Sequence, residues 1–75
     1  MFSIGTKILD ELTGKKGIVV GTKDNPYKPK FDPFNRAVIP FEIDSMDYQI
    51  MFLRSDGDYS GICERKEGDL TLLME

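Results

Sequence analysis

The chain opens with two apolar runs, within residues 4–12 and 18–20, joined by a turn that has Gly14 and Gly17 at its ends. Glycine adopts positive φ at little steric cost, which suits it to the ends of a tight connection. The second run, Ile18 to Val20, is β-branched throughout and fits the pleated surface of a strand. This stretch therefore predicts an opening β-hairpin around which the rest of the fold is organised.

A short helix is the alternative for residues 6–12. Thr6 is a suitable N-cap, the apolar residues that follow, among them Ile8 and Leu9, fall on one helical face, and Gly14 is a suitable C′ residue. However, isolated helices shorter than about 12 to 15 residues are marginal in water unless packing supports them. We therefore expect a strand.

Residues 22–36 interrupt this pattern with three prolines, Pro26, Pro29 and Pro33. Proline has no N–H for a strand ladder, and it disfavours a helical conformation in the residue before it. The segment is therefore predicted to be a long irregular loop. Loops of this length are uncommon in compact domains and are usually functional or mobile.

Alternating polarity returns in residues 37–43 and predicts another strand, with Pro40 indicating an edge position or a bulge. Residues 48–54 are apolar on both faces, as expected of a central strand that is covered twice. Asp56 and Gly57 then favour a type I′ hairpin, from which residues 59–64 return.

A polar turn at residues 65–69 precedes a short closing strand at residues 70–74. If these strands form one core, alternate residues should point inward. The residues expected to face inward are Ile18, Val20, Ile50, Phe52, Ile62 and Leu72.

This order of strands and turns resembles the SH3-like barrels, in particular the KOW-type and Tudor-type members. The residues that carry the resemblance are Gly5 with Ile8, then Gly14, Gly17 and Val19, then Tyr48 to Phe52 followed by Asp56 and Gly57. The resemblance implies a single domain over residues 1–75, mainly β, with five to six antiparallel strands and one long proline-rich loop. The loop is long for a KOW unit, and the strand at residues 37–43 is an addition to the pattern.

Such barrels characteristically present peptides, nucleic acids or modified side chains to a surface formed by loops, so the resemblance implies a binding module. The residues argue against an enzyme, because the chain has no histidine to act as a general base or metal ligand. Cys63 has no neighbour that would activate its thiol, and Asp56-Gly57-Asp58 lacks the spaced ligands of a calcium loop. No cofactor and no metal is expected.

Candidate binding residues lie in the long loop. Its stretch from Lys23 to Pro29 has the basic-x-x-Pro-x-x-Pro spacing of polyproline ligands, although prolines that merely stiffen a loop explain it more simply. The loop aromatics, with Tyr48 and Tyr59, form either an aromatic cage or a lid folded back on the sheet. The predicted binding residues are Lys23, Tyr27, Lys28, Lys30, Phe31, Phe34 and Arg36.

Charge is distributed unevenly along the chain. Residues 15–36 sum to +4 and residues 37–75 to −6, while the whole chain of 75 residues carries −3. A net negative charge disfavours tight sequence-independent binding to nucleic acid. We therefore expect a protein partner, which includes a second copy of the chain. The alternatives are a KOW-like nucleic-acid-associated module and a small inhibitor or accessory protein from a mobile element.

A cytoplasmic location without membrane contact is expected, because no apolar run approaches the roughly 20 residues that cross a bilayer and the N-terminus lacks the order of a secretory signal.

Overall fold

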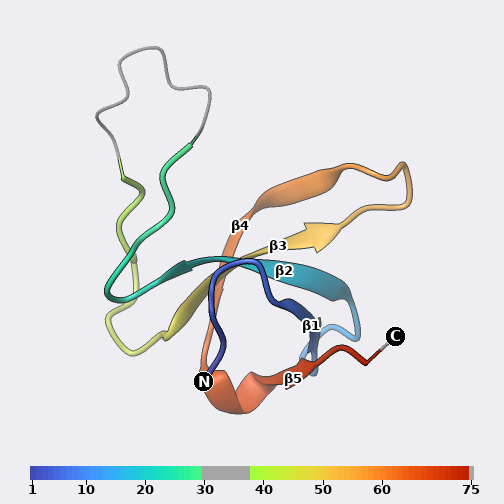
Figure 1. Cartoon of the computed structure of the whole chain (residues 1–75), viewed down its shortest axis with the longest axis horizontal. Helices are drawn as coiled ribbons and strands as arrows, with labels where there is room; N and C mark the ends of the chain where they lie inside the picture. The colour runs from blue at the N-terminus through green and yellow to red at the C-terminus, as the bar shows by residue number, and fades with distance from the viewer. Residues whose placement is uncertain (30–37, 75) are drawn as a thin grey trace.

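The computed structural model describes residues 1–29 and 38–74, which are mainly β with almost no helix (Figure 1). Among the described residues, no helix has the length and apolar character needed to span a bilayer. The elements, in chain order, are strands β1 (Lys7–Asp10), β2 (Lys16–Thr22), β3 (Tyr48–Leu53) and β4 (Tyr59–Arg65), a 3₁₀ turn at Glu67–Asp69, and strand β5 (Leu70–Leu72).

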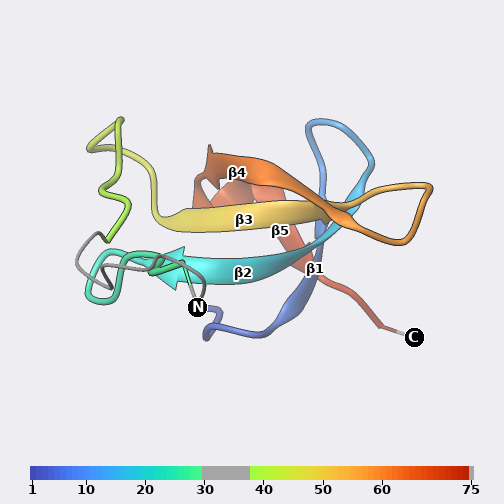
Figure 2. The ribbon, with the colours of Figure 1, turned by 90° about the horizontal axis from the view of Figure 1, so that it is seen from above.

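The five strands form one antiparallel sheet in the order β4-β3-β2-β1-β5. β1 pairs with a strand on each side, and these two ladders explain why residues 7–10 form the predicted strand rather than the alternative helix. The sheet is strongly twisted, so that β1 runs at a steep angle to β3 (Figure 2). β4 and β5 are its two edges, so the described sheet is not closed.

The core lies on one face of this twisted sheet. It contains one residue from β1 and one from β2, three from β3 and one from β5, with Phe2 and Cys63 packed against them. The buried residues are Ile8, Val19, Tyr48, Ile50, Phe52 and Leu70. The inward positions predicted for Ile50 and Phe52 are therefore confirmed, whereas Leu72 is half exposed and Leu70 takes the buried place in β5.

In β2 the structure buries the face opposite to the one predicted. Val19 is fully buried, while Ile18 and Val20, which were expected to point inward, are only partly buried. The inward positions on either side of Val19 are glycines, and a Cβ at Gly17 would lie 2.7 Å from the carbonyl oxygen of Met51. Because two of its three inward positions carry no side chain, the buried face of β2 is less apolar in sequence than its outer face.

The strand predicted for residues 37–43 is wrong over its described part, residues 38–43, which form no strand. The backbone N–H groups there bond outside any ladder. The N–H of Ile39 donates to the Tyr27 carbonyl at 2.7 Å, and those of Glu42 and Ile43 donate to the Glu64 carboxylate at 2.7 and 3.0 Å. Pro40 has no N–H to donate, which removes one more ladder bond.

The hairpin between β3 and β4 forms, but with a longer loop than predicted. The Arg54 N–H donates to the Asp58 carbonyl at 2.7 Å, and the Gly57 N–H donates to the Arg54 carbonyl at 3.0 Å. Gly57 has φ 85° and follows this turn. The loop therefore spans three residues, with glycine in the left-handed position, instead of the two of a type I′ turn.

An ion pair within the molecule links β1 to the end of β4. Asp10 is fully buried, and Nε of Arg65 lies 3.2 Å from each of its carboxylate oxygens. The Thr13 hydroxyl donates to the same carboxylate at 2.7 Å, and the Arg65 guanidinium lies 5.5 Å from the centroid of the Phe52 ring. This pair joins the first strand to an edge strand that it does not contact through a ladder.

Arg65→Met should lower the free energy of unfolding by about 3 to 5 kcal/mol, because it leaves a buried carboxylate without its cation. Arg54→Met is the matched control. The Arg54–Asp56 pair measures 3.0 Å but both side chains are more than half exposed, so its loss should cost less than about 1 kcal/mol. Urea unfolding compares the two, and equal small losses would contradict a stabilising role for the buried pair.

Tyr48 and Glu67 form a second cluster, at the N-terminal segment. The Tyr48 hydroxyl donates to the Glu67 carboxylate at 2.5 Å and accepts the Phe2 N–H at 2.9 Å, and the two aromatic rings meet edge to face. Burial, together with the hydrogen bond to Glu67, raises the pKa of Tyr48 above its ordinary value of 10.0. The hydrogen bond from Tyr48, together with the Met1 amine, lowers the pKa of Glu67.

A raised tyrosine pKa in the folded state means that the stability this group contributes is complete below about pH 10 and is lost as pH rises through the folded pKa. Urea unfolding at increasing alkaline pH should therefore show a loss of stability that Tyr48→Phe reduces. Tyr59→Phe, at an exposed tyrosine, is the control and should retain the loss. An identical alkaline slope for all three proteins would contradict the assignment.

Candidate functional site

The chain leaves the sheet after β2 and returns at β3 through two limbs, residues 23–29 and 38–47, which we call the arm (Figure 1). A buried side chain reinforces the backbone hydrogen bond from the Ile39 N–H to the Tyr27 carbonyl, which joins the two limbs. Oε1 of Gln49 accepts the Tyr27 N–H at 2.7 Å, and its Nε2 donates to the Ile39 carbonyl at 2.7 Å. Gln49 thereby fixes the backbone of Tyr27, which Lys28 follows in the chain, relative to the sheet.

Gly21 makes this arrangement possible. It stands opposite Gln49 in the β2–β3 ladder, beside an irregularity in register after Val19. A Cβ at this position would lie 2.1 Å from Oε1 of Gln49 and 2.7 Å from the Tyr27 nitrogen. Only a residue without a side chain leaves room for the amide and for the backbone of the arm at the same place.

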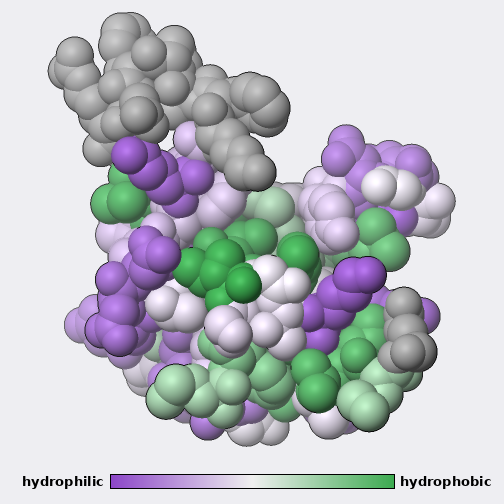
Figure 3. All heavy atoms as spheres, viewed as in Figure 1, coloured by the Kyte–Doolittle hydropathy of each residue, from purple (hydrophilic) through white to green (hydrophobic). Residues whose placement is uncertain are grey.

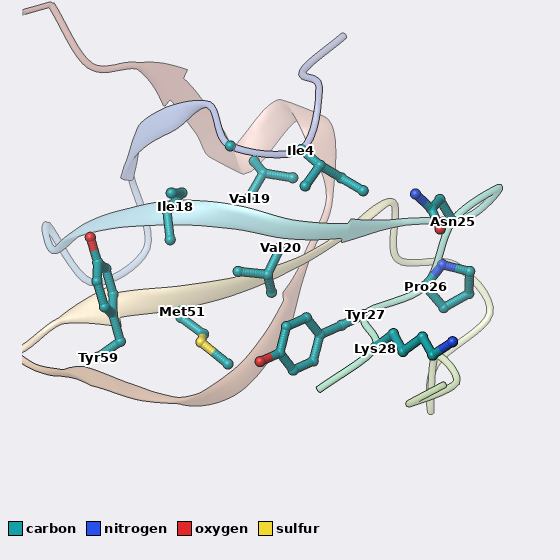
Figure 4. A pocket seen from close by; sticks show the side chains of 11 residues that line it. Ile4, Ile18, Val19, Val20, Asn25, Pro26, Tyr27, Lys28, Met51 and Tyr59 are labelled. Atoms are coloured by element: carbon teal, nitrogen blue, oxygen red, sulfur yellow. The ribbon is translucent and has the colours of Figure 1, made fainter. Parts of the chain in front are cut away.

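A groove of about 470 Å³ opens on the outer face of β2, between the base of the arm and β4. Its wall and floor are mostly aliphatic, with one thioether. In Figure 4 Tyr59 stands at one end of the row formed by Ile18, Val20 and Met51, and Tyr27 and Lys28 stand at the other. The residues that line the groove are Ile4, Gly5, Ile18, Val19, Val20, Asn25, Pro26, Tyr27, Lys28, Met51 and Tyr59.

The groove exposes apolar surface that a sheet normally keeps for its core. Ile4 is 46% exposed and Tyr59 42% exposed. Figure 3 shows apolar side chains gathered near the middle of the face in view, with polar ones to the left and right of them. The solvent side of an antiparallel sheet usually carries polar residues, so this apolar groove is the candidate contact surface.

Of the predicted binding residues, the structure brings Tyr27 and Lys28 to the groove. Lys23 lies elsewhere: its Nζ is 4.3 Å from the centroid of the Phe41 ring, and it lines a separate hollow with Tyr48 and Glu67. Through this cation–π contact Lys23 supports the arm. Lys30, Phe31, Phe34 and Arg36 lie outside the described residues.

The described aromatics among those considered for a cage or a lid are divided between the two faces of the sheet. Tyr48 is buried in the core against Phe2, whereas Tyr27 and Tyr59 line the groove on the outer face. The grouping of Tyr48 with the other two is therefore wrong. Alternation explains the separation, because Tyr48 shares the inward face of β3 with Ile50 and Phe52.

Sequence reasoning missed the floor of the groove. The sequence pattern predicts that Ile18 and Val20 lie in the core and that Met51 lies on a covered face of its strand. The available signal was the pair of glycines that flank Val19, since an inward face with small residues leaves the larger ones outside.

Among the described residues, the lining of the groove includes no carboxylate, thiol or imidazole, and Lys28 is its one cationic side chain. Within the described ranges, no group of three or more histidine, cysteine, aspartate or glutamate side chains is arranged to hold a metal ion.

Comparison of the chain with protein-family models, with curated proteins and with solved structures finds no match. The residues of the groove are therefore the basis on which its function is inferred.

Gln49→Met should lower the free energy of unfolding by about 1 to 3 kcal/mol, because it leaves the Tyr27 N–H and the Ile39 carbonyl without a partner. Amide hydrogen exchange at Tyr27 should accelerate more than exchange at Ile50, which reports the core strand. If Tyr27 and Ile50 change in parallel, the amide of Gln49 supports the whole sheet and does not specifically hold the arm.

Proposed function

We propose that this chain is a small non-enzymatic binding module of the SH3-like barrel class and that it binds a protein partner in the groove on the outer face of β2. The observation that carries the proposal is the apolar groove itself, with Tyr27 and Tyr59 at its two ends and Lys28 beside Tyr27. Aromatic side chains of this kind are enriched at protein interfaces, where they provide large contact area at low entropic cost.

Three features support the assignment to the SH3-like class. The strand order β4-β3-β2-β1-β5 places the last strand beside the first, the sheet is strongly twisted, and a 3₁₀ turn at Glu67–Asp69 precedes β5. The long connection between β2 and β3 then forms the arm at one end of the groove. Such an arrangement suits a module whose specificity resides in loops carried by a rigid sheet.

In this proposal the arm contributes two of the predicted binding residues to the groove. Its base supplies Tyr27 and Lys28 to the groove, and Gln49 holds the backbone of Tyr27 in place before any partner arrives. Groups that are already positioned lose less conformational entropy on binding than mobile ones. The predicted contribution of Lys30, Phe31, Phe34 and Arg36 stays a prediction, as does the cytoplasmic location.

The nucleic-acid alternative is favoured by one observation, which is that a lysine and two tyrosines share the groove. Stacking on tyrosines and contact with a cation are the usual components of single-strand binding. The net charge of −3 opposes it. The third expectation, an inhibitor or accessory protein from a mobile element, gains no support from the described residues.

Affinity capture from the native cell extract, after nuclease treatment, tests the proposal. The wild-type chain should retain a protein partner that Tyr59→Ser and Met51→Ser both lose. Leu72→Ser is the matched control, because Leu72 is 51% exposed but lies on β5, outside the groove. Circular dichroism verifies that each variant folds.

A partner retained equally by all the variants would place binding elsewhere and refute the groove. Loss of every captured protein on nuclease treatment would favour the nucleic-acid alternative.

A further inference from the structure

We infer that the groove recognises an extended, acidic segment of the partner protein, with apolar side chains in the middle and carboxylates towards its ends. This inference rests on the proposed function and specifies the chemistry of the partner. It is carried by a second hollow that continues the groove and by the charges along both.

The groove continues beyond Tyr59. A hollow of about 120 Å³ adjoins it, and Tyr59 lines both. The other residues that line this second hollow are Lys7, Lys16, Gly17, Leu53 and Leu73. The two hollows therefore follow β2 from its first residue, Lys16, to the base of the arm.

The length of this surface fits an extended peptide. A strand rises about 3.3 Å per residue, so the seven residues of β2 span roughly 23 Å. An extended segment of about six or seven residues covers the same distance, and every second side chain of it faces the sheet. Two or three apolar side chains would contact Ile18, Val20 and Met51 between the two tyrosines.

Charge complementarity identifies the ends of the segment as acidic. Lys28 lines the groove at the arm, whereas Lys7 lines the hollow at the opposite end. Among the described residues, those that line the two hollows include no aspartate or glutamate, although the chain has 13 acidic residues against 10 basic ones. By contrast, the hollow beside the N-terminus is lined by Asp24, Asp47 and Glu67.

The same observations disfavour the other occupants. Residues 30–37 of this chain carry Lys30 and Arg36 against Asp32, which gives them the same sign of charge as the surface. A long polyanion such as nucleic acid meets the negative charge of the whole molecule, whereas a short acidic segment contacts only the local lysines. The aliphatic floor between the tyrosines suits apolar side chains better than stacked bases.

Selection of a randomised peptide display library on the full-length chain tests this inference. The selected sequences should be enriched in aspartate or glutamate on both sides of alternating apolar residues. A synthetic peptide of the selected sequence, carrying a fluorescent label, then reports affinity by anisotropy at physiological salt.

The double reversal Lys7→Glu/Lys28→Glu should weaken the selected peptide by roughly tenfold or more, because two attractions become repulsions. Both lysines are exposed, so the variant should fold. Lys66→Glu is the control of matched charge type, since Lys66 is exposed and lies outside the lining of both hollows. A peptide with its carboxylates replaced by lysines should bind the double variant better than it binds the wild-type chain.

The outcomes separate the two proposals. Neutral apolar peptides that lose affinity with Met51→Ser but not with the lysine reversal would refute the acidic segment and keep the groove. Selected peptides whose affinity is unchanged by Met51→Ser, or the recovery of no binding peptide, would refute both.

Two further results would also overturn the acidic segment. One is steeply salt-dependent binding of a labelled oligothymidylate that the lysine reversal abolishes. The other is a dimer in sedimentation equilibrium that Met51→Ser dissociates, which would identify a second copy as the occupant.

Discussion

The candidate site depends on one buried amide. Gln49 is fully buried, and its two polar atoms bond the two limbs of the arm rather than a strand. A buried amide without partners is costly, so its burial requires that Tyr27 and Ile39 stay where they are. Gly21 is needed for the same geometry, because any side chain there would overlap the amide. The sheet and the arm are therefore joined by a constraint that fixes one end of the groove.

Much of the fold could be predicted from the sequence, because its local signals agree with its tertiary pairing. The strand around Ile50 follows from its continuous apolar run, and the strands around Ile8 and Cys63 follow from the glycine turns beside them. The strand predicted for residues 37–43 could not be excluded in this way. Polar and apolar residues do alternate there, but the N–H groups of residues 39, 42 and 43 bond to Tyr27 and Glu64, which are distant in sequence.

The sequence did not predict the groove because the inward face of β2 carries smaller side chains than its outer face. On β2 the buried row is glycine, valine, glycine, and the outer row contains Ile18 and Val20. Hydrophobicity alone assigns the larger apolar residues to the core. This places the inward face one residue away from its true position, and such a shift exchanges the two faces of a strand. Tyr27 and Lys28 are identified because aromatic and basic residues in a proline-rich loop are conspicuous, but nothing local in the sequence indicates that Gln49 bonds to Tyr27.

The placement of apolar residues outside the core has a thermodynamic meaning in so small a domain. A single core in a chain of 75 residues contributes little net stability, and burial of Ile18, Val20 and Met51 would add to it. Leaving them partly exposed forgoes part of that gain. Among the described residues every buried side-chain nitrogen or oxygen atom has a hydrogen-bond partner, so the interior is specified closely. Under the proposed function, the partly exposed apolar row would release free energy when a partner covers it, which the satisfied interior of the domain does not require for its own specificity.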